Sequence, residues 1–198
     1  EFTAEQIIEQ TASNDAVFVD TRGHLAVAEG TVAGALAIPA IAKMANFGAW
    51  AFDPEADDRQ LILFAEDLQA AQQMRYHLMR VGIDAVSGYA TSLEGLPAFT
   101  PPSVAPAELE HFEHALLLDV RNRSEFAAGA IPNAKHISVG RALWSLDVLP
   151  ADGKIVTYCQ SGLRNSIVAS ALRDAGYDVV ELAGSYAGWA AAMAKTNA

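Results

Sequence analysis

The sequence predicts an α/β protein made of two similar units in tandem, each a parallel sheet with helices on both faces. Short apolar runs that suit buried strands alternate with stretches of helical periodicity, which is typical of parallel sheets. The apolar pattern of the first half recurs in the second, and self-similarity over this length indicates two copies of one unit. Between the halves lies a proline-rich joint with the composition of a semi-rigid linker. Its prolines are Pro97, Pro101, Pro102 and Pro106. We therefore expect domains at 1–98 and 104–198.

The first half begins with a helix, because Thr3 and Gln6 have the spacing of a capping box and the apolar residues after them suit a helix. Short apolar runs then predict strands, and a longer amphipathic segment predicts a helix that ends at Gly82. The expected strands are residues 16–20, 35–38, 61–64 and a short one from 85, and the expected helix covers 67–81.

The second half repeats these features in the same order. Residues 115–119 match residues 16–20, and residues 155–176 match 61–82 without a gap. Residues 155–158 should therefore form a buried strand. Ile167, Val168, Ala171, Leu172 and Ala175 fall on one face at helical spacing and predict a helix, for which Gly176 supplies the C-terminal stop.

Composition and charge narrow the range of functions. The chain has 198 residues, of which 52% are apolar and 19% charged, as expected for a globular protein. Its net charge of −11 argues against nucleic acid or an anionic membrane surface as a partner. There is no apolar run of membrane-spanning length and no signal-peptide pattern, so we expect a cytoplasmic location. A single cysteine excludes an internal disulfide framework. We expect no metal and no cofactor, since the five histidines are scattered along the sequence: His24, His77, His111, His114 and His136.

That single cysteine, Cys159, opens the loop between the expected strand at 155–158 and the helix that follows. Unpaired N–H groups and the positive end of the dipole at a helix N-terminus favour an anion, so the thiolate form of Cys159 should be stabilised. Gly162 permits the loop to curl its amides inward into an anion-binding nest, and Arg164 adds a permanent cation. A lone cysteine is more often a small buried apolar residue. The pattern Cys-x-x-Gly-x-Arg between a strand and a helix nevertheless favours a nucleophile.

This loop resembles the active loop of the rhodanese family of sulfurtransferases. The resemblance implies that Cys159 is the catalytic residue and carries a persulfide, with the loop amides cradling the outer sulfur. Cysteine phosphatases of the same fold carry one more residue between Cys and Arg, so the shorter loop here suits sulfur better than a phosphoryl group. The residues implied to form the binding loop are Gln160, Ser161, Gly162, Leu163 and Arg164.

Other segments of the second half also resemble the family. Leu118–Arg121, with Glu125 and Phe126 after it, resembles its strand-and-turn signature. Asp119 is expected either to brace Arg121 or the loop amides below the site, or to act only as a strand-end cap or turn former. Arg121 is expected either to gather an anionic donor or to be a buried partner of Asp119 or Glu125. Residues 182–189 resemble its closing motif, with Ser185 where glycine is usual. Trp144 and Trp189 are expected in the core.

The first half lacks the same chemistry. Ala65 stands at the position that matches Cys159, Glu66 and Asp67 replace Gln160 and Ser161, and Leu68 replaces Gly162. We expect this half to be a rhodanese-like domain without catalysis.

The resemblance implies a sulfurtransferase that takes sulfane sulfur from thiosulfate or a low-molecular-weight persulfide and passes it to a thiol or cyanide. A non-catalytic sulfur-sensing or scaffold module is the alternative, and a cysteine phosphatase or arsenate reductase is disfavoured by loop length. The sequence is similar to the rhodanese portion of fusions with a metallo-β-lactamase-type persulfide dioxygenase. Because it starts at Glu1 without Met, it is expected to be a trimmed or partial polypeptide, with a dioxygenase domain upstream as a possible partner.

Overall fold

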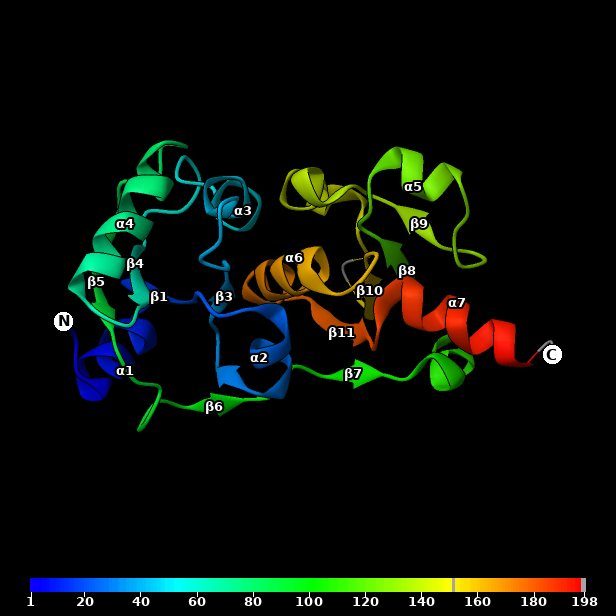
Figure 1. The fold of residues 1–198 in the computed structure, drawn as a ribbon, viewed down its shortest axis with the longest axis horizontal. Coiled ribbons are helices and arrows are strands. Elements are labelled where there is room, and N and C mark those ends of the chain that lie inside the picture. The colour runs from blue at the N-terminus through cyan, green and yellow to red at the C-terminus, as the bar shows by residue number, and fades with distance from the viewer. Residues whose placement is uncertain (151, 197–198) are drawn as a thin grey trace. The chain divides into compact units, whose positions relative to one another are not determined.

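A computed structural model describes residues 1–150 and 152–196, and the chain divides into two compact units at residues 1–100 and 101–198 (Figure 1). The elements of the first unit are α1 (Ala4–Ala12), β1 (Ala16–Asp20), α2 (His24–Glu29), β2 (Thr31–Val32), β3 (Leu36–Ala37), α3 (Met44–Ala51), β4 (Gln60–Phe64), α4 (Leu68–Met79), β5 (Val86–Ala90) and β6 (Ala98–Phe99). Those of the second are β7 (Ser103–Val104), the 3-10 helix η1 (Pro106–Phe112), β8 (Leu116–Asp119), α5 (Arg123–Ala127), β9 (Lys135–His136), the 3-10 helices η2 (Val139–Arg141) and η3 (Leu143–Val148), β10 (Lys154–Tyr158), α6 (Leu163–Asp174), β11 (Asp178–Leu182) and α7 (Ser185–Thr196).

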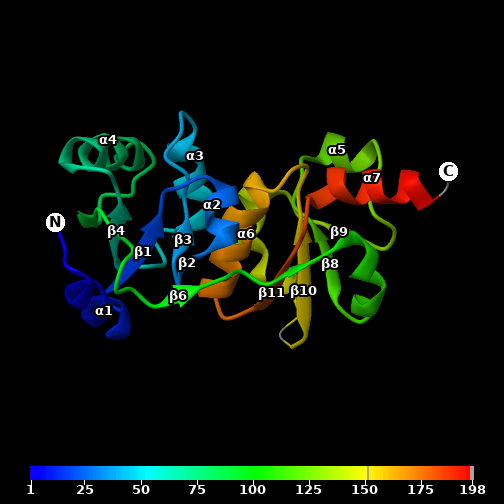
Figure 2. The same ribbon diagram turned by 60° about the horizontal axis from the view of Figure 1, so that its bottom comes forward.

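The first unit is built on a four-stranded sheet in the order β3-β1-β4-β5, with every neighbouring pair parallel. Alternate residues of a strand face opposite sides of a sheet. Phe18 and Ile62 lie on one side and pack with Ile7 of α1, each about 1% exposed or less. Burying a side chain of this size contributes about 1.5–3 kcal/mol. Figure 2 shows α1 and α4 on opposite sides of β1 and β4, so both faces are covered.

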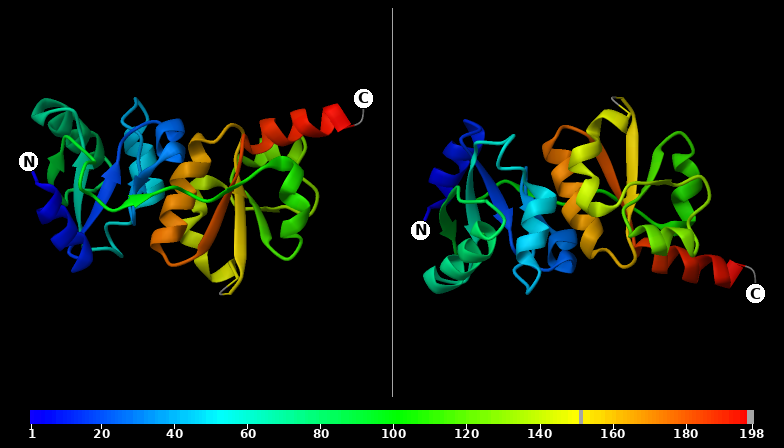
Figure 3. Two further views of the ribbon diagram at one scale, coloured as in Figure 1. Left: turned by 90° about the horizontal axis from the view of Figure 1, so that it is seen from below. Right: turned by 90° about the horizontal axis from the view of Figure 1, so that it is seen from above.

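The second unit has a five-stranded, all-parallel sheet in the order β7-β11-β10-β8-β9. Val156, Tyr158, Val180 and Leu182 form one apolar face, on which residues from η1 and α7, including Trp189, pack. The helix α6 contacts β10 and β11, and Figure 3 shows it on the other side of these strands from α7. The predicted α/β class with parallel sheets and helices is therefore confirmed.

The two sheets share a strand order. Reading from one edge, β3-β1-β4-β5 corresponds to β9-β8-β10-β11. In each unit the segment at the N-terminal end also forms a backbone hydrogen bond with the last of these four strands. In the first unit Phe2 N donates to Tyr89 O at 2.8 Å, and in the second Glu181 N donates to Pro102 O at 2.9 Å. The same connection pattern thus occurs in both halves.

Local signals in the sequence located most elements closely. The capping box is confirmed: Gln6 N donates to Thr3 Oγ1 at 3.4 Å, and Thr3 N donates to Gln6 Oε1 at 2.9 Å. The helix expected before Gly176 is α6, and Gly176 follows it with φ of +90°, a conformation that glycine adopts without strain.

One expectation was incomplete and one was wrong. The proline-rich joint is not only a linker, because Ala98 and Phe99 pair with β2 and Ser103 and Val104 pair with β11. Proline lacks a backbone N–H but keeps its carbonyl, and here Ala33 N donates to Pro97 O at 2.8 Å and Glu181 N donates to Pro102 O at 2.9 Å. Trp144 is not in the core: it lies in η3 and is 61% exposed.

Within residues 1–150 and 152–196, none of the helices combines the length and apolar character needed to cross a bilayer.

Candidate active site

Cys159 directly follows β10, the central strand of the second sheet. Because β8 and β11 flank this strand, its residues from Ile155 to Tyr158 are all buried. Cys159 is itself 1% exposed, whereas Gln160 and Ser161 after it are exposed. The sulfur therefore lies at the base of a loop whose outer residues are open to solvent.

Gly162 forms the bend that returns the loop to the sulfur. Its φ of +111° and ψ of −34° lie in a region that a side chain would strain, and it is the residue before the first turn of α6. The amide N of Gly162 lies 3.1 Å from Cys159 Sγ and donates to it. A hydrogen bond from an N–H favours the anionic form of its acceptor, so this contact stabilises a thiolate.

The N-terminus of α7 fixes the orientation of the loop's first two peptides. Tyr186 N donates to Cys159 O at 3.0 Å, and Ala187 N donates to Gln160 O at 3.1 Å. In a planar trans peptide the carbonyl and the following N–H point in opposite directions. The N–H groups of Gln160 and Ser161 consequently point away from α7. The resemblance implies that five loop amides surround an outer sulfur; of these, the structure shows the Gly162 amide bonded to Cys159 Sγ itself.

Arg164, in the first turn of α6, is held by a carboxylate from α5. Its Nη1 donates to Glu125 Oε2 at 2.6 Å and its Nη2 donates to Oε1 at 2.8 Å. These hydrogen bonds lower the pKa of Glu125 to about 2 against the opposing effect of burial. The same bonds raise the pKa of Arg164, and the neighbouring Cys159 adds to that rise. The guanidinium thus lies near the sulfur with most of its charge already compensated.

Asp119 and Arg121 form a buried pair below the loop. Arg121 donates from Nε and Nη2 to the Asp119 carboxylate, with Nη2 to Oδ2 at 2.7 Å, and the two side chains are 2% and 0% exposed. Arg121 Nη2 also donates to Gly129 O at 2.7 Å, and the guanidinium carbon lies 3.9 Å from the centre of the Tyr186 ring. Arg121 has one long contact to the loop, from Nη1 to Gln160 Oε1 at 3.5 Å. This arrangement makes Arg121 a brace between strand, turn and loop.

Two residues of the site were not among those expected. Glu125 pairs with Arg164, and its Oε2 also accepts from Asn122 N at 3.0 Å, so it caps α5 at the same time. Ser185 Oγ accepts from Cys159 N at 3.3 Å and lies 4.0 Å from Cys159 Sγ. The sequence held a signal for each of them. Glu125 has the Asn-x-x-Glu spacing of a capping box, and Ser185 stands where the family's closing motif usually has glycine.

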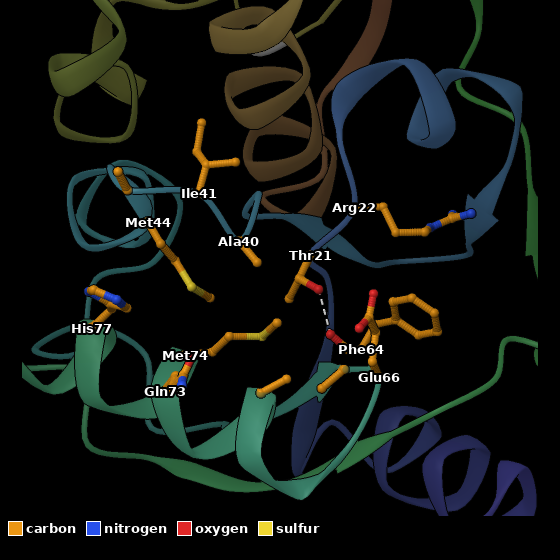
Figure 4. A pocket seen from close by; sticks show the side chains of 13 residues that line it. Thr21, Arg22, Ala40, Ile41, Met44, Phe64, Glu66, Gln73, Met74 and His77 are labelled. Carbon is orange, nitrogen blue, oxygen red and sulfur yellow. Dashed lines mark hydrogen bonds between the residues drawn. The ribbon is translucent and has the colours of Figure 1, made fainter.

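The corresponding place in the first unit has a different lining. Ala65 follows β4 there, and a cavity of about 540 Å³ opens beside it (Figure 4). Figure 4 shows Met44, Met74 and His77 on one side of this cavity and the Thr21 hydroxyl bonded to Phe64 O on the other. The described residues place no cysteine or glycine at this loop.

The amide of Ala70 in the first turn of α4 is taken by the carboxylate of Asp67, whose Oδ1 lies 2.7 Å away. The brace is nevertheless repeated, because Arg22 pairs with Asp20 at 2.6 Å and its Nη2 donates to Gly30 O at 2.7 Å. The first unit thus has the same support below its loop without a nucleophile in it.

The chain shows clear similarity to known proteins. Residues 105–192 match the family model described as the rhodanese-like domain. The putative sulfurtransferase YtwF of Bacillus subtilis is 34% identical over 82 residues, which are 41% of this chain and 80% of that protein. A sulfurtransferase of Allochromatium vinosum is 34% identical over 79 residues, or 39% of this chain and 74% of that protein.

A human relative extends this similarity. The thiosulfate:glutathione sulfurtransferase of Homo sapiens is 33% identical over 106 residues, which cover 44% of this chain and 92% of that protein. This chain aligns with most of the length of each of these three relatives, at more than 30% identity. The chain therefore belongs to the rhodanese-like domain family of sulfurtransferases.

Proposed function

We propose that the second unit transfers sulfane sulfur from a low-molecular-weight persulfide or thiosulfate to a thiol or cyanide acceptor, through a persulfide on Cys159. In the first step the Cys159 thiolate attacks the outer sulfur of the donor. The donor's S–S bond breaks, and its electron pair leaves with a thiolate or sulfite. In the second step the acceptor attacks the outer sulfur of the persulfide, and Cys159 leaves as a thiolate. The enzyme returns to its starting state, so ping-pong kinetics are expected.

The observation that carries this proposal is the contact from Gly162 N to Cys159 Sγ at 3.1 Å. Cys159 is a thiolate at the start of the first step and leaves as a thiolate in the second, and an N–H already aimed at its sulfur stabilises that charge without reorganisation. The amides of Gln160 and Ser161, turned away from α7 by the bonds to the preceding carbonyls, can bind an outer sulfur that carries charge. The relatives, which are named sulfurtransferases, support the same chemistry.

The local charges favour a persulfide over thiosulfate as donor. Thiosulfate is a dianion and would need uncompensated positive charge at the loop. Arg164 is paired with Glu125, Gln160 and Ser161 are neutral, and the chain carries a net charge of −11. A thiol persulfide with less charge near the reacting sulfur suits these surroundings better. Its transfer would follow the same two steps.

We also propose that the two units are tandem rhodanese-like copies and that the first has no catalytic role. The shared strand order and the repeated Arg–Asp–glycine carbonyl brace support common descent of the two units. Ala65 leaves the first loop without a cysteine, and the capping carboxylate of Asp67 takes the first-turn amide of Ala70 and places a negative charge where an anion would bind.

A donor panel tests the proposed reaction. Thiosulfate, glutathione persulfide and mercaptopyruvate would each be supplied with cyanide or a thiol, and thiocyanate or sulfide would be measured. Turnover with a sulfane donor that disappears in Cys159→Ser supports the proposal. Binding of donor without turnover favours a sulfur-sensing module, and hydrolysis of an aryl phosphate favours a phosphatase. Turnover retained in Cys159→Ser refutes the assignment of the nucleophile.

A further inference from the structure

Ser185 has a backbone conformation that serine rarely adopts. It starts α7, is 0% exposed, and has φ of +52° directly after Gly184 with φ of +68°. Glycine takes this left-handed conformation freely, whereas a side chain makes it less favourable. A buried serine at such a position therefore suggests that its hydroxyl makes contacts that offset the strain.

Those contacts are with the reactive cysteine. Cys159 N donates to Ser185 Oγ at 3.3 Å, so the hydroxyl oxygen accepts from the backbone of the cysteine. The hydroxyl keeps one hydrogen of its own, and Cys159 Sγ lies 4.0 Å away as its acceptor. One side chain thus holds both the backbone and the sulfur of Cys159.

Two hydrogen-bond donors to the sulfur come from different helices. Gly162 N approaches from the N-terminus of α6 at 3.1 Å, and Ser185 Oγ approaches from the N-terminus of α7. The α7 backbone holds the same loop through Tyr186 N and Ala187 N. Residues 185–187 therefore act together on Cys159 and Gln160, and Ser185 is the member whose side chain reaches the sulfur.

We propose that Ser185 is a positioning residue for the Cys159 thiolate, and that its hydroxyl hydrogen bond strengthens when negative charge develops on Sγ. This inference rests on the proposed function and deepens it. The step most affected is the second one, because Cys159 becomes the leaving thiolate when the acceptor removes the outer sulfur. If the hydroxyl bonds the Cys159 thiolate more strongly than it bonds the uncharged inner sulfur of the persulfide, it makes Cys159 a better leaving group.

Two variants separate the hydroxyl from the backbone. Ser185→Gly removes the hydroxyl and relieves the strain, whereas Ser185→Ala removes the hydroxyl and keeps the strain. We expect both to discharge a preformed Cys159 persulfide to a thiol about 5- to 10-fold more slowly, which is the range for loss of one modest hydrogen bond. Ser185→Gly should nevertheless melt at a temperature equal to or above that of Ser185→Ala. Ser103→Ala, on the exposed edge strand β7, serves as the matched control and should not change the rate.

A second readout does not require sulfur transfer. Because the chain has one cysteine, alkylation by iodoacetamide reports the Cys159 thiolate alone. Both variants should react about 5-fold more slowly at low pH and approach the unmodified protein at high pH, where the thiol is fully ionised. Two charged pairs lie at the loop: Arg164–Glu125, from α6 and α5, and Arg121–Asp119, at and just after the end of β8. Neither variant alters these pairs.

The outcomes are distinguishable. Discharge and alkylation rates in Ser185→Gly that equal those of the unmodified protein would overturn the role of Ser185, and would leave the proposed function intact. If Cys159→Ser still transfers sulfur, the proposed function fails, and the alkylation profiles alone then decide whether Ser185 stabilises the thiolate.

Discussion

Arg164 and Glu125 form a two-bonded ion pair beside the sulfur of Cys159, with N–O distances of 2.6 and 2.8 Å. The sequence identifies Arg164 as the cation of the loop, but the pairing shows that this cation is shared with α5. A permanent cation next to a reactive thiolate would attract any small anion. The carboxylate reduces that attraction and fixes the guanidinium in one position.

Replacement of this carboxylate has a pH-dependent effect on stability. The pKa of Glu125 is lowered from 4.5 to about 2 by Arg164, so the ion pair stabilises the fold above about pH 4.5 and this contribution is lost as pH falls toward 2. We expect Glu125→Gln to lower the free energy of unfolding by about 1 kcal/mol at pH 7, because the pair is partly exposed. Thermal melts of both proteins at pH 7, 5 and 3 measure this difference in stability, and the difference between Glu125→Gln and the unmodified protein should be smaller at pH 3 than at pH 7. A gap that widens toward acid would contradict the pairing.

Substitution of Gly162 should abolish transfer. Alanine at φ of +111° strains the backbone by about 1–2 kcal/mol and turns the amide away from Cys159 Sγ. Gly153 offers a matched control: it has φ of +105° in the turn before β10, with open space around its Cα. We expect Gly162→Ala and Gly153→Ala to lose similar stability, and only Gly162→Ala to lose turnover. Equal loss of turnover in both would assign the effect to unfolding.

The buried brace makes a prediction about the fold. Asp119→Asn leaves the Arg121 guanidinium, 2% exposed, without its counter-charge, and removal of one partner of such a pair typically costs about 3–5 kcal/mol. The matched variant in the first unit is Asp20→Asn, where the side chain of Arg22 is 28% exposed and water can solvate part of its charge. Denaturant unfolding should show the larger loss for Asp119→Asn. A larger loss for Asp20→Asn would mean that burial of the arginine is not the deciding factor.

Restoring a cysteine to the first unit should not restore activity. In Ala65→Cys the new thiol would follow β4, but Leu68 stands in place of Gly162 and the Asp67 carboxylate occupies the amide of Ala70. These groups disfavour an anion at the loop. We expect the variant, combined with Cys159→Ser, to gain no sulfur from a donor. Peptide mapping by mass would locate any added sulfur. Sulfur found at the substituted position after β4 would contradict this expectation, because it would show that a cysteine at this place in the fold forms a persulfide without a glycine bend and free loop amides.

The sequence locates the features that depend on neighbours along the chain. The strand, the cysteine, the glycine bend and the following helix lie within one segment, 155–176, and each has a local signal. The capping of α1 by Thr3 is likewise a contact between residues three apart.

The contacts missed by the sequence join residues far apart. Glu125 reaches Arg164 from α5, and Ser185 reaches Cys159 from α7. Neither contact follows from spacing, because each depends on which strand ends lie side by side in the sheet. The exposure of Trp144 has the same origin, since an aromatic residue in a short 3-10 helix is buried only where another element covers it.

The most direct test of the account is the intact mass of the protein after incubation with a sulfane donor and again after addition of a thiol. We predict a gain of one sulfur atom, located on Cys159 by peptide mapping and absent from Cys159→Ser, followed by its loss to the thiol. A mass that does not change under conditions where the protein is folded, or added sulfur that the thiol cannot remove, would contradict transfer through Cys159.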